Sequence, residues 1–311
     1  MVTLSGVRAR RWGLPFSLVR LCLSEARPVV QIIFLLRFAS GSALGSGMTA
    51  SVLLGAFAWE CAVVFVYLLN GVTDVVEDAV NASRRPIARG ALPRGFARGF
   101  AFLAGGLALL AGLAMGAEFF AAIAAFMLLG YLYSAPPYQL KRHPAGAAVV
   151  VTLGGLLTYW GGLASGDGTT GGLLTNWGDG TPGDPLLAAG VLAVAMSLWM
   201  GLVGTPTKDF SDTAGDAAAG RRSAADLFGA SAVRRGVGLT AIALGGAYLY
   251  AASALAPMLV PAAAVTLAGA IVLAVLAVSP LSRGSRKAAR LPYRVFMATQ
   301  YGTHLVVALT L

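Results

Sequence analysis

The chain has 311 residues, of which 57% are hydrophobic and only 12% are charged. Soluble globular proteins carry about a quarter charged residues, so this composition excludes an ordinary soluble enzyme and indicates an integral membrane protein. The net charge of +10 does not indicate a nucleic-acid partner, because the basic residues gather in the N-terminal segment and in every second loop, as membrane topology requires.

The segment 1–27 is basic, and its apolar stretch is interrupted by Arg20, Glu25 and Arg27. A cleaved signal peptide needs an uninterrupted apolar core, so we expect this segment to be a cytoplasmic N-terminal tail. Residues 28–311 are expected to form a single transmembrane domain.

Nine apolar runs in that domain are each long enough to cross a bilayer as a helix. They are residues 28–48, 50–72, 97–115, 117–134, 145–165, 185–206, 232–253, 257–280 and 292–311. Basic residues cluster at 8–27, 84–98, 141–142, 208–235 and 283–294, and the positive-inside rule makes these segments cytoplasmic. The N-terminus is therefore expected inside and the C-terminus outside. The Ala- and Gly-rich composition favours a bacterial source, and hence the plasma membrane.

Two charged residues fall deep inside the predicted spans. Arg37 lies in the first span and Glu60 in the second, each about 15 Å from its cytoplasmic end at about 1.5 Å per residue. Ionisable groups in a membrane helix are costly unless they are paired, so we expect these two side chains to form an ion pair.

An acidic segment follows the second span. Asn70, Asp74 and Asp78 are four residues apart, so on a helix they form an oxygen-rich stripe along one face. Only 13 residues of the chain are acidic, and three of them lie between 74 and 78, which argues against an ordinary solvated loop. Hard oxygen ligands of this kind suit Mg²⁺ bound together with phosphate oxygens.

A second acidic segment follows the sixth span and repeats this spacing. Lys208, Asp212 and Asp216 are again four residues apart, and Asp209 adds a further carboxylate. Four helices separate the two segments, and this even number places both on the same side of the membrane. We therefore predict an all-α membrane protein of two pseudo-repeated four-helix halves plus a final helix, whose paired segments hold a diphosphate between metal ions.

Basic residues accompany both segments and are candidates for binding phosphate oxygens. They are Arg84, Arg85, Lys141, Arg142 and Lys208. The Gly-rich stretch 162–184 is a weaker candidate, because it lacks the Lys-Ser/Thr ending of a P-loop and lies on the opposite face.

Together these motifs resemble those of the UbiA superfamily of membrane prenyltransferases, over nearly the whole chain. Residues 70–78 are similar to the family's Asn-x-x-x-Asp-x-x-x-Asp motif, and residues 85–90 resemble its Arg-Pro-x-x-x-Gly segment. Residues 133–141 resemble its Tyr-Ser-x-Pro-Pro-x-x-Leu-Lys loop, and residues 208–216 its Lys-Asp-x-x-Asp-x-x-Gly-Asp motif. Gly71 and Ala214 depart from the pattern, since many members have acidic or amide residues there.

The resemblance implies a role for each motif residue. Mg²⁺ and the diphosphate are expected to be held by Asn70, Asp74, Asp78, Asp209, Asp212 and Asp216. The catalytic members of this set are expected to be Asp74, Asp78, Asp212 and Asp216. The diphosphate is expected to contact Arg85, Tyr138, Lys141 and Lys208.

We therefore expect a Mg²⁺-dependent enzyme that ionises an allylic isoprenoid diphosphate and transfers the prenyl group to an acceptor, most simply a small aromatic molecule. The alternative is a terpene cyclase, in which the chain's own double bond attacks the cation. Candidates for lining the pocket are Trp59, Tyr67, Tyr159, Trp160 and Trp199. A cation-coupled transporter is disfavoured because the acids lie at the membrane edge. A phosphatidyl transferase is disfavoured because its Asp-Gly-x-x-Ala-Arg start is absent.

Overall fold

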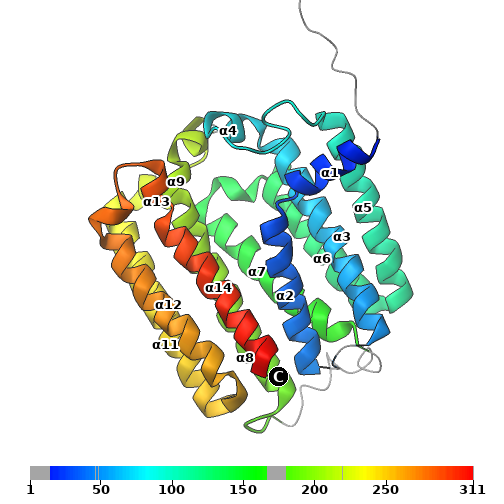
Figure 1. The fold of residues 1–311 in the computed structure, drawn as a ribbon, viewed down its shortest axis with the longest axis vertical. Coiled ribbons are helices and arrows are strands. Elements are labelled where there is room, and N and C mark those ends of the chain that lie inside the picture. The colour runs from blue at the N-terminus through cyan, green and yellow to red at the C-terminus, as the bar shows by residue number, and fades with distance from the viewer. Residues whose placement is uncertain (1–14, 46, 48, 167–179, 219, 311) are drawn as a thin grey trace, which may run out of the picture.

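The computed structural model describes residues 15–45, 47, 49–166, 180–218 and 220–310, and within these ranges it is helical and contains no strand (Figure 1). The α-helices are α1 Pro15–Glu25, α2 Pro28–Gly45, α3 Ala50–Thr73, α4 Val75–Val80, α5 Arg94–Met115, α6 Ala117–Ser134, α7 Pro144–Ala164, α8 Pro185–Leu198, α9 Thr205–Ala218, α10 Ala224–Phe228, α11 Ala230–Leu255, α12 Val260–Val278, α13 Arg286–Ala289 and α14 Leu291–Thr310. A π-helix, η2, at Trp199–Gly204 joins α8 to α9, and short 3-10 turns occupy η1 Leu140–Arg142, η3 Pro257–Leu259 and η4 Pro280–Ser282.

Eight helical segments of the described chain are long and apolar enough to cross a membrane. They are Pro28–Gly45, Ala50–Thr73, Arg94–Met115, Ala117–Ser134, Pro144–Ala164, Pro185–Asp212, Ala230–Leu255 and Pro257–Val278. They confirm the first eight predicted spans. The ninth predicted span forms α14, which is not among these eight. Its polar Gln300, Thr303 and His304 are buried because α14 packs against α12 and α2 and turns them toward the bundle interior.

The helices form one bundle whose two ends differ. In Figure 1, α1, α4, α9 and α13 lie at one end, and α14 finishes at the opposite end. The first acidic segment spans the junction of α3 and α4, the second lies on α9, and α4 contacts α9. The two acidic segments are therefore neighbours at the same end of the bundle, as the even number of intervening helices predicts.

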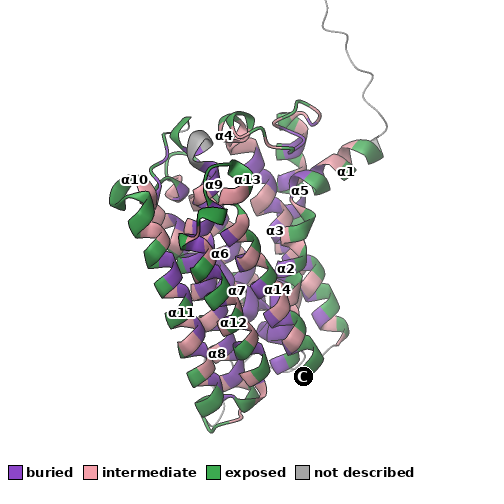
Figure 2. Cartoon of the chain, turned by 60° about the vertical axis from the view of Figure 1, so that its left-hand side comes forward, coloured by how far each residue is buried: buried purple, intermediate pink, exposed green. Residues whose placement is uncertain are grey.

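The buried apolar residues of the described chain form three clusters, and Figure 2 shows the buried residues on the inward sides of the long helices. In the first half of the bundle, one cluster includes Trp59 and another includes Leu68. The third cluster, in the other half, includes Trp199 and Leu273. The halves meet where α2 crosses α7. A Cβ added at Gly41 would lie 2.4 Å from the carbonyl oxygen of Tyr159, so only glycine permits this close approach.

Part of the predicted N-terminal tail is a packed helix. Residues 1–14 lie outside the described ranges, but α1 contacts α3, and Cys22 and Glu25 of α1 and the following Ala26 are completely buried. Most of the Gly-rich stretch, including Asp167 and Asp179, also lies outside the described residues. Asp184 caps α8, because its Oδ1 accepts a hydrogen bond of 2.7 Å from the backbone of Leu186.

The predicted ion pair between Arg37 and Glu60 is not present in the described structure. Arg37 donates a hydrogen bond to the side chain of Gln300 on α14, and Oε1 of Glu60 is buried without a partner among the described residues. The reason is that α14 packs against α2 and places Gln300 beside Arg37, so the guanidinium is turned toward α14 and not toward Glu60 of α3.

Candidate active site

A cavity of about 190 Å³ opens at the acidic end of the bundle and extends inward. Its polar end is lined by Arg27, Asn70, Asp74, Lys141, Lys208, Asp209 and Arg221. Its inner wall is mostly apolar and aromatic, from Ile33, Phe34, Tyr67, Phe126, Leu129, Val150, Met200 and Phe296. Such a cavity suits a ligand with a charged head and an apolar tail.

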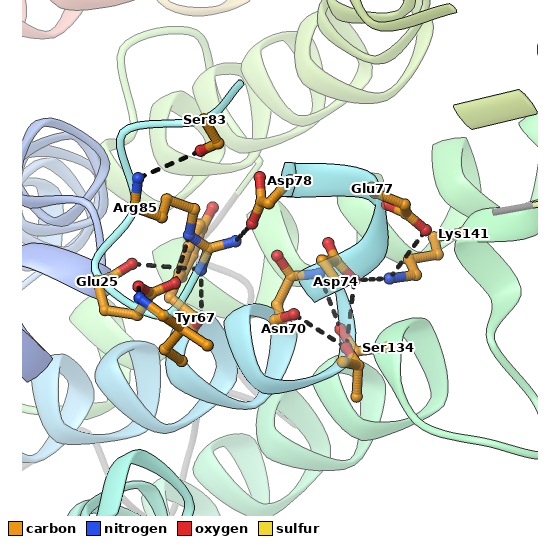
Figure 3. Close-up of polar contacts among 12 residues, drawn as sticks. Glu25, Tyr67, Asn70, Asp74, Glu77, Asp78, Ser83, Arg85, Ser134 and Lys141 are labelled. Carbon is orange, nitrogen blue, oxygen red and sulfur yellow. Dashed lines mark hydrogen bonds and ion pairs between the residues drawn. The ribbon is translucent and has the colours of Figure 1, made fainter. Parts of the chain in front are cut away.

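The first acidic segment is held by a change of helix at Asp74, which ends α3 and precedes α4. The four-residue hydrogen-bond pattern continues through this junction, from Asp74 N–H to Asn70 O at 2.9 Å and from Asp78 N–H to Asp74 O at 2.8 Å. Asn70 donates from Nδ2 to Ser134 Oγ at 3.2 Å, and Lys141 pairs directly with Asp74 (Figure 3). Glu77 lies 3.7 Å from the same ammonium.

Arg85 forms a second group beside this one, and Figure 3 shows the two groups on opposite sides of the α3–α4 junction. Its Nε lies 2.6 Å from Glu25 Oε1, and its Nη1 donates to Asp78 Oδ2 at 2.9 Å. Nη2 donates to the backbone oxygens of Tyr67 and Glu25. The guanidinium is only 6% exposed and does not line the cavity. Arg85 therefore ties α1 to the acidic segment.

This tie explains the glycine at position 71. A Cβ added to Gly71 would lie 2.3 Å from Glu25 Oε1 and 2.5 Å from Arg85 Nη2. The space that an acidic or amide side chain needs is therefore filled by the ion pair of Glu25 with Arg85. The departure of this chain from the family motif has a packing cause.

The second acidic segment lies on the continuous helix α9. Arg221 bridges two of its carboxylates, at 3.2 Å to Asp209 Oδ1 and 3.3 Å to Asp216 Oδ1. Asp212 accepts a hydrogen bond from Ser211 at 3.0 Å and pairs with Arg286 at 3.2 Å. Arg221 is buried, whereas Arg286 is 41% exposed, so the two ion pairs lie in different environments.

The charges at the polar end influence one another strongly. Burial lowers the pKa of Lys141 to about 7, and the nearby cations Lys208 and Arg221 add to this effect. Burial also disfavours the charge on Arg221, but Asp209 and Asp216 outweigh it and raise the pKa of that guanidinium. Burial raises the pKa of Glu77. Buried cations held this close together favour the binding of a multiply charged anion, which would restore the full charge of Lys141.

Within the described residues, no group of three or more His, Cys, Asp or Glu side chains is arranged as a metal site. Each carboxylate of the acidic segments is paired with a cation instead. The second oxygen of Asp216, Oδ2, is buried and has no hydrogen-bond partner in the described structure. The donors are all carboxylate or amide oxygens, the ligands that Mg²⁺ prefers. These residues fit Mg²⁺ that arrives with the oxygens of a bound phosphate.

In the structure, the site residues predicted from the sequence form two groups, and Tyr138 belongs to neither. Asn70, Asp74, Lys141, Lys208 and Asp209 line the cavity. Asp78, Arg85, Asp212 and Asp216 form the ion pairs just outside it. Tyr138 is 59% exposed and is not among the cavity-lining residues.

Sequence reasoning missed several cavity residues, namely Arg27, Arg37, Tyr133, Arg221 and Gln300. Arg221 follows the second segment directly, but a basic residue in such a loop is expected for topology alone. Of the aromatic candidates, Tyr67 lines the cavity. Trp59, Tyr159 and Trp199 are fully packed in the apolar cores instead.

A second hollow, of about 550 Å³, lies between α6, α7 and α8. Its lining is apolar and includes Leu153, Trp160 and Gly190. Leu129 lines both this hollow and the inner end of the first cavity. The two spaces therefore adjoin at one side chain.

The sequence of the chain matches one protein family and resembles one known relative. A sequence model of the UbiA prenyltransferase family matches residues 29–299. A digeranylgeranylglyceryl phosphate synthase from Thermococcus sibiricus is 30% identical over 164 residues, 52% of this chain and 50% of that protein, so the match spans about half the length of that relative.

Solved structures share the fold along most of the chain. A UbiA homologue from Archaeoglobus fulgidus bound to DMAPP and Mg²⁺ has a TM-score of 0.61 at 19% identity, covering 92% of this chain and 99% of that one. The form bound to GPP and Mg²⁺ gives 0.60 at 20% identity, covering 93% and 99%. A digeranylgeranylglyceryl phosphate synthase structure gives 0.65 at 16% identity, covering 94% and 98%.

Proposed function

This chain belongs to the UbiA prenyltransferase family and is an integral membrane protein, and from that premise we propose that it is a Mg²⁺-dependent enzyme that ionises an allylic isoprenoid diphosphate and transfers the prenyl group to an acceptor. The observation that carries the proposal is the cavity itself. Two acidic segments and three cations, the buried Lys141 and Arg221 and the half-buried Lys208, meet at the polar end of a space whose inner wall is mostly apolar.

The residues of the chain divide the work of binding the diphosphate. Lys141, Lys208 and Arg221 are placed to contact the phosphate oxygens and to keep them at the polar end. Asn70 and the carboxylates of both segments would hold Mg²⁺, which would neutralise the charge that develops on the leaving diphosphate. The internal ion pairs of Asp74 with Lys141 and of Asp209 with Arg221 must rearrange when the anion binds.

The inner part of the cavity protects the reacting carbon. Phe34, Tyr67 and Phe126 present aromatic rings beside the polar end, with Phe34 packed edge-on to both others at 6.0 and 5.6 Å. Aromatic faces stabilise a nearby cation, and the apolar wall excludes the water that would capture it.

We further propose that the prenyl chain passes Leu129 into the second hollow. This space is apolar, adjoins the first cavity and lies among membrane-spanning helices. A Cβ at Gly190 would meet no atom within 4 Å, so Gly190→Phe should fill the hollow without a clash and shorten the longest chain that is accepted. Gly106→Phe on α5 is the matched control, since it is equally open and lies away from the hollow. Equal chain-length profiles in both variants would rule out this path.

Two classes of acceptor are compatible with this proposal. An aromatic acceptor fits the aromatic inner wall, whereas the name of the Thermococcus sibiricus relative points to a glyceryl phosphate lipid.

We also propose that the polar end faces the cytoplasm of a bacterial cell, because the loops at this end carry most of the basic residues.

The proposal is tested with purified protein in Mg²⁺, supplied with geranyl, farnesyl or geranylgeranyl diphosphate, with and without candidate acceptors. We expect slow diphosphate release alone, accelerated by the right acceptor, and a prenylated acceptor detected by mass spectrometry. A cyclic hydrocarbon formed without acceptor would establish the terpene cyclase alternative. No diphosphate release under any condition would contradict both.

A further inference from the structure

Arg37 carries a positive charge in the interior of the bundle and has no negative partner among the residues that the structure describes. It lies nine residues after the start of α2, about 14 Å along the helix axis, and is 1% exposed. Each ion pair of the described chain joins other residues, so no described carboxylate lies within 4.0 Å of this guanidinium. A buried charge without a counter-charge is among the most costly features a fold can have.

The neighbours of Arg37 are neutral. Its Nη2 donates to Oε1 of Gln300, and its guanidinium lies 5.4 Å from the ring centre of Phe34. The Tyr159 hydroxyl lies beside it and is itself 2.5 Å from Nε2 of His304. Nε and Nη1 of Arg37 are buried with no hydrogen-bond acceptor among the described side chains and backbone. Two donors and one full charge are therefore left unsatisfied by the described protein.

The location of Arg37 indicates which ligand would supply the missing negative charge. Arg37 and Gln300 both line the first cavity, together with the aromatic rings of Phe34 and Phe126. The diphosphate has its own cations at the polar end, where the carboxylates that suit Mg²⁺ also lie. An anion at Arg37 would thus be a second one, deeper and among aromatic walls, where the other reactant has to meet the prenyl carbon.

We propose that Arg37 and Gln300 bind an oxyanion of the acceptor, a carboxylate or a phosphate, at the inner end of the cavity. This inference rests on the proposed function, because it presumes an acceptor. The ion pair fixes one end of the acceptor, so that its nucleophilic atom is held toward the polar end. A carboxylate would belong to an aromatic acid and a phosphate to a lipid.

The sharpest variant is Gln300→Glu, which supplies the missing negative charge from within the protein. It keeps the size of the side chain, pairs Arg37 internally and should leave the fold intact. Arg37→Met removes the charge itself, and Arg98→Met at the exposed start of α5 is the matched control. A purely structural role for Arg37 predicts that Gln300→Glu is neutral or favourable.

The test measures binding to the full-length protein with Mg²⁺ present, using two pairs of probes that differ in charge. The pairs are 4-hydroxybenzoate with its methyl ester, and geranylgeranylglyceryl phosphate with the corresponding alcohol. We expect one acid to bind the wild type and Arg98→Met, and to bind Gln300→Glu and Arg37→Met about 30-fold more weakly or worse, since a buried ion pair is lost. The acid that binds identifies the source of the oxyanion.

A non-reactive thio analogue of geranylgeranyl diphosphate separates this inference from the proposed function. It should bind all four proteins equally. Failure of the wild type to bind this analogue would contradict the proposed function. Normal binding of the analogue, with acid affinities that neither variant changes or that do not exceed those of the neutral probes, would overturn the acceptor site alone.

Discussion

The two acidic segments repeat one spacing but use it differently. In the first, the chain changes helix at Asp74, and the cation on Asp78 is the buried Arg85, which also binds Glu25 of α1. In the second, α9 is continuous, and the cation Arg221 joins two carboxylates and lines the cavity. A repeat in sequence thus places equivalent acids at one end of the bundle. The arginines beside them differ, because Arg85 holds α1 against the first segment and Arg221 lines the cavity.

The largest expected effect is common to both segments. Asp74→Ala or Asp212→Ala should each lower the rate of Mg²⁺-dependent diphosphate release at least about 1000-fold, which is roughly 4 kcal/mol of transition-state stabilisation. Each substitution removes an oxygen ligand for Mg²⁺ and leaves a cation unpaired. Asp226→Ala, in the capping box of the exposed α10, is the control. Release is measured by a coupled phosphate assay. A near-normal rate in either variant would mean that its segment does not serve the diphosphate.

The next effect separates the segments by stability. Arg85→Met should destabilise the fold by about 3–5 kcal/mol, because it leaves the carboxylate of Glu25 buried without its cation. The measurement is unfolding in detergent, and Glu25→Gln combined with Arg85→Met should recover part of the loss. A variant of normal stability with a tenfold higher KM for the prenyl diphosphate would show that Arg85 binds the substrate directly, as the family resemblance implies.

Arg221 should differ from Arg85 in its effect on substrate binding. Arg221→Met should raise the KM for the prenyl diphosphate by about 10- to 100-fold, because a charge-assisted contact to phosphate is worth roughly 1.5–3 kcal/mol. Arg222→Met, at the exposed neighbouring position, is the matched control. If the Arg221 variant lost stability while keeping its KM, the contrast drawn between the two arginines would be wrong.

The smallest effect belongs to Arg286. Arg286→Met breaks the pair with Asp212, but its side chain is 41% exposed, and solvent screens such a pair. We expect a stability change below about 1 kcal/mol and a turnover within about threefold of the wild type. A loss as large as that of Arg221→Met would place Arg286 among the residues that bind the diphosphate.

The sequence predicted what depends on local pattern. Apolar runs of about 20 residues located the first eight spans, and the even helix offset brought Asp74 and Asp212 to one end. Prediction from the sequence failed where a contact depends on which distant helices become neighbours. Arg85 meets Glu25 across 60 residues, and Arg37 meets Gln300 across 263. Gly71 looked like a missing acid, and only the packing of Glu25 with Arg85 shows why no side chain fits there.

The two acidic segments are expected to act as one site on one diphosphate. The most direct test compares diphosphate release from geranylgeranyl diphosphate by the wild type, Asp74→Ala, Asp212→Ala and the double variant, all with Mg²⁺. Residues that act as a unit are not additive, so the double variant should be no slower than the slower single variant. Losses that simply multiply in the double variant would contradict the claim and make the two segments independent sites.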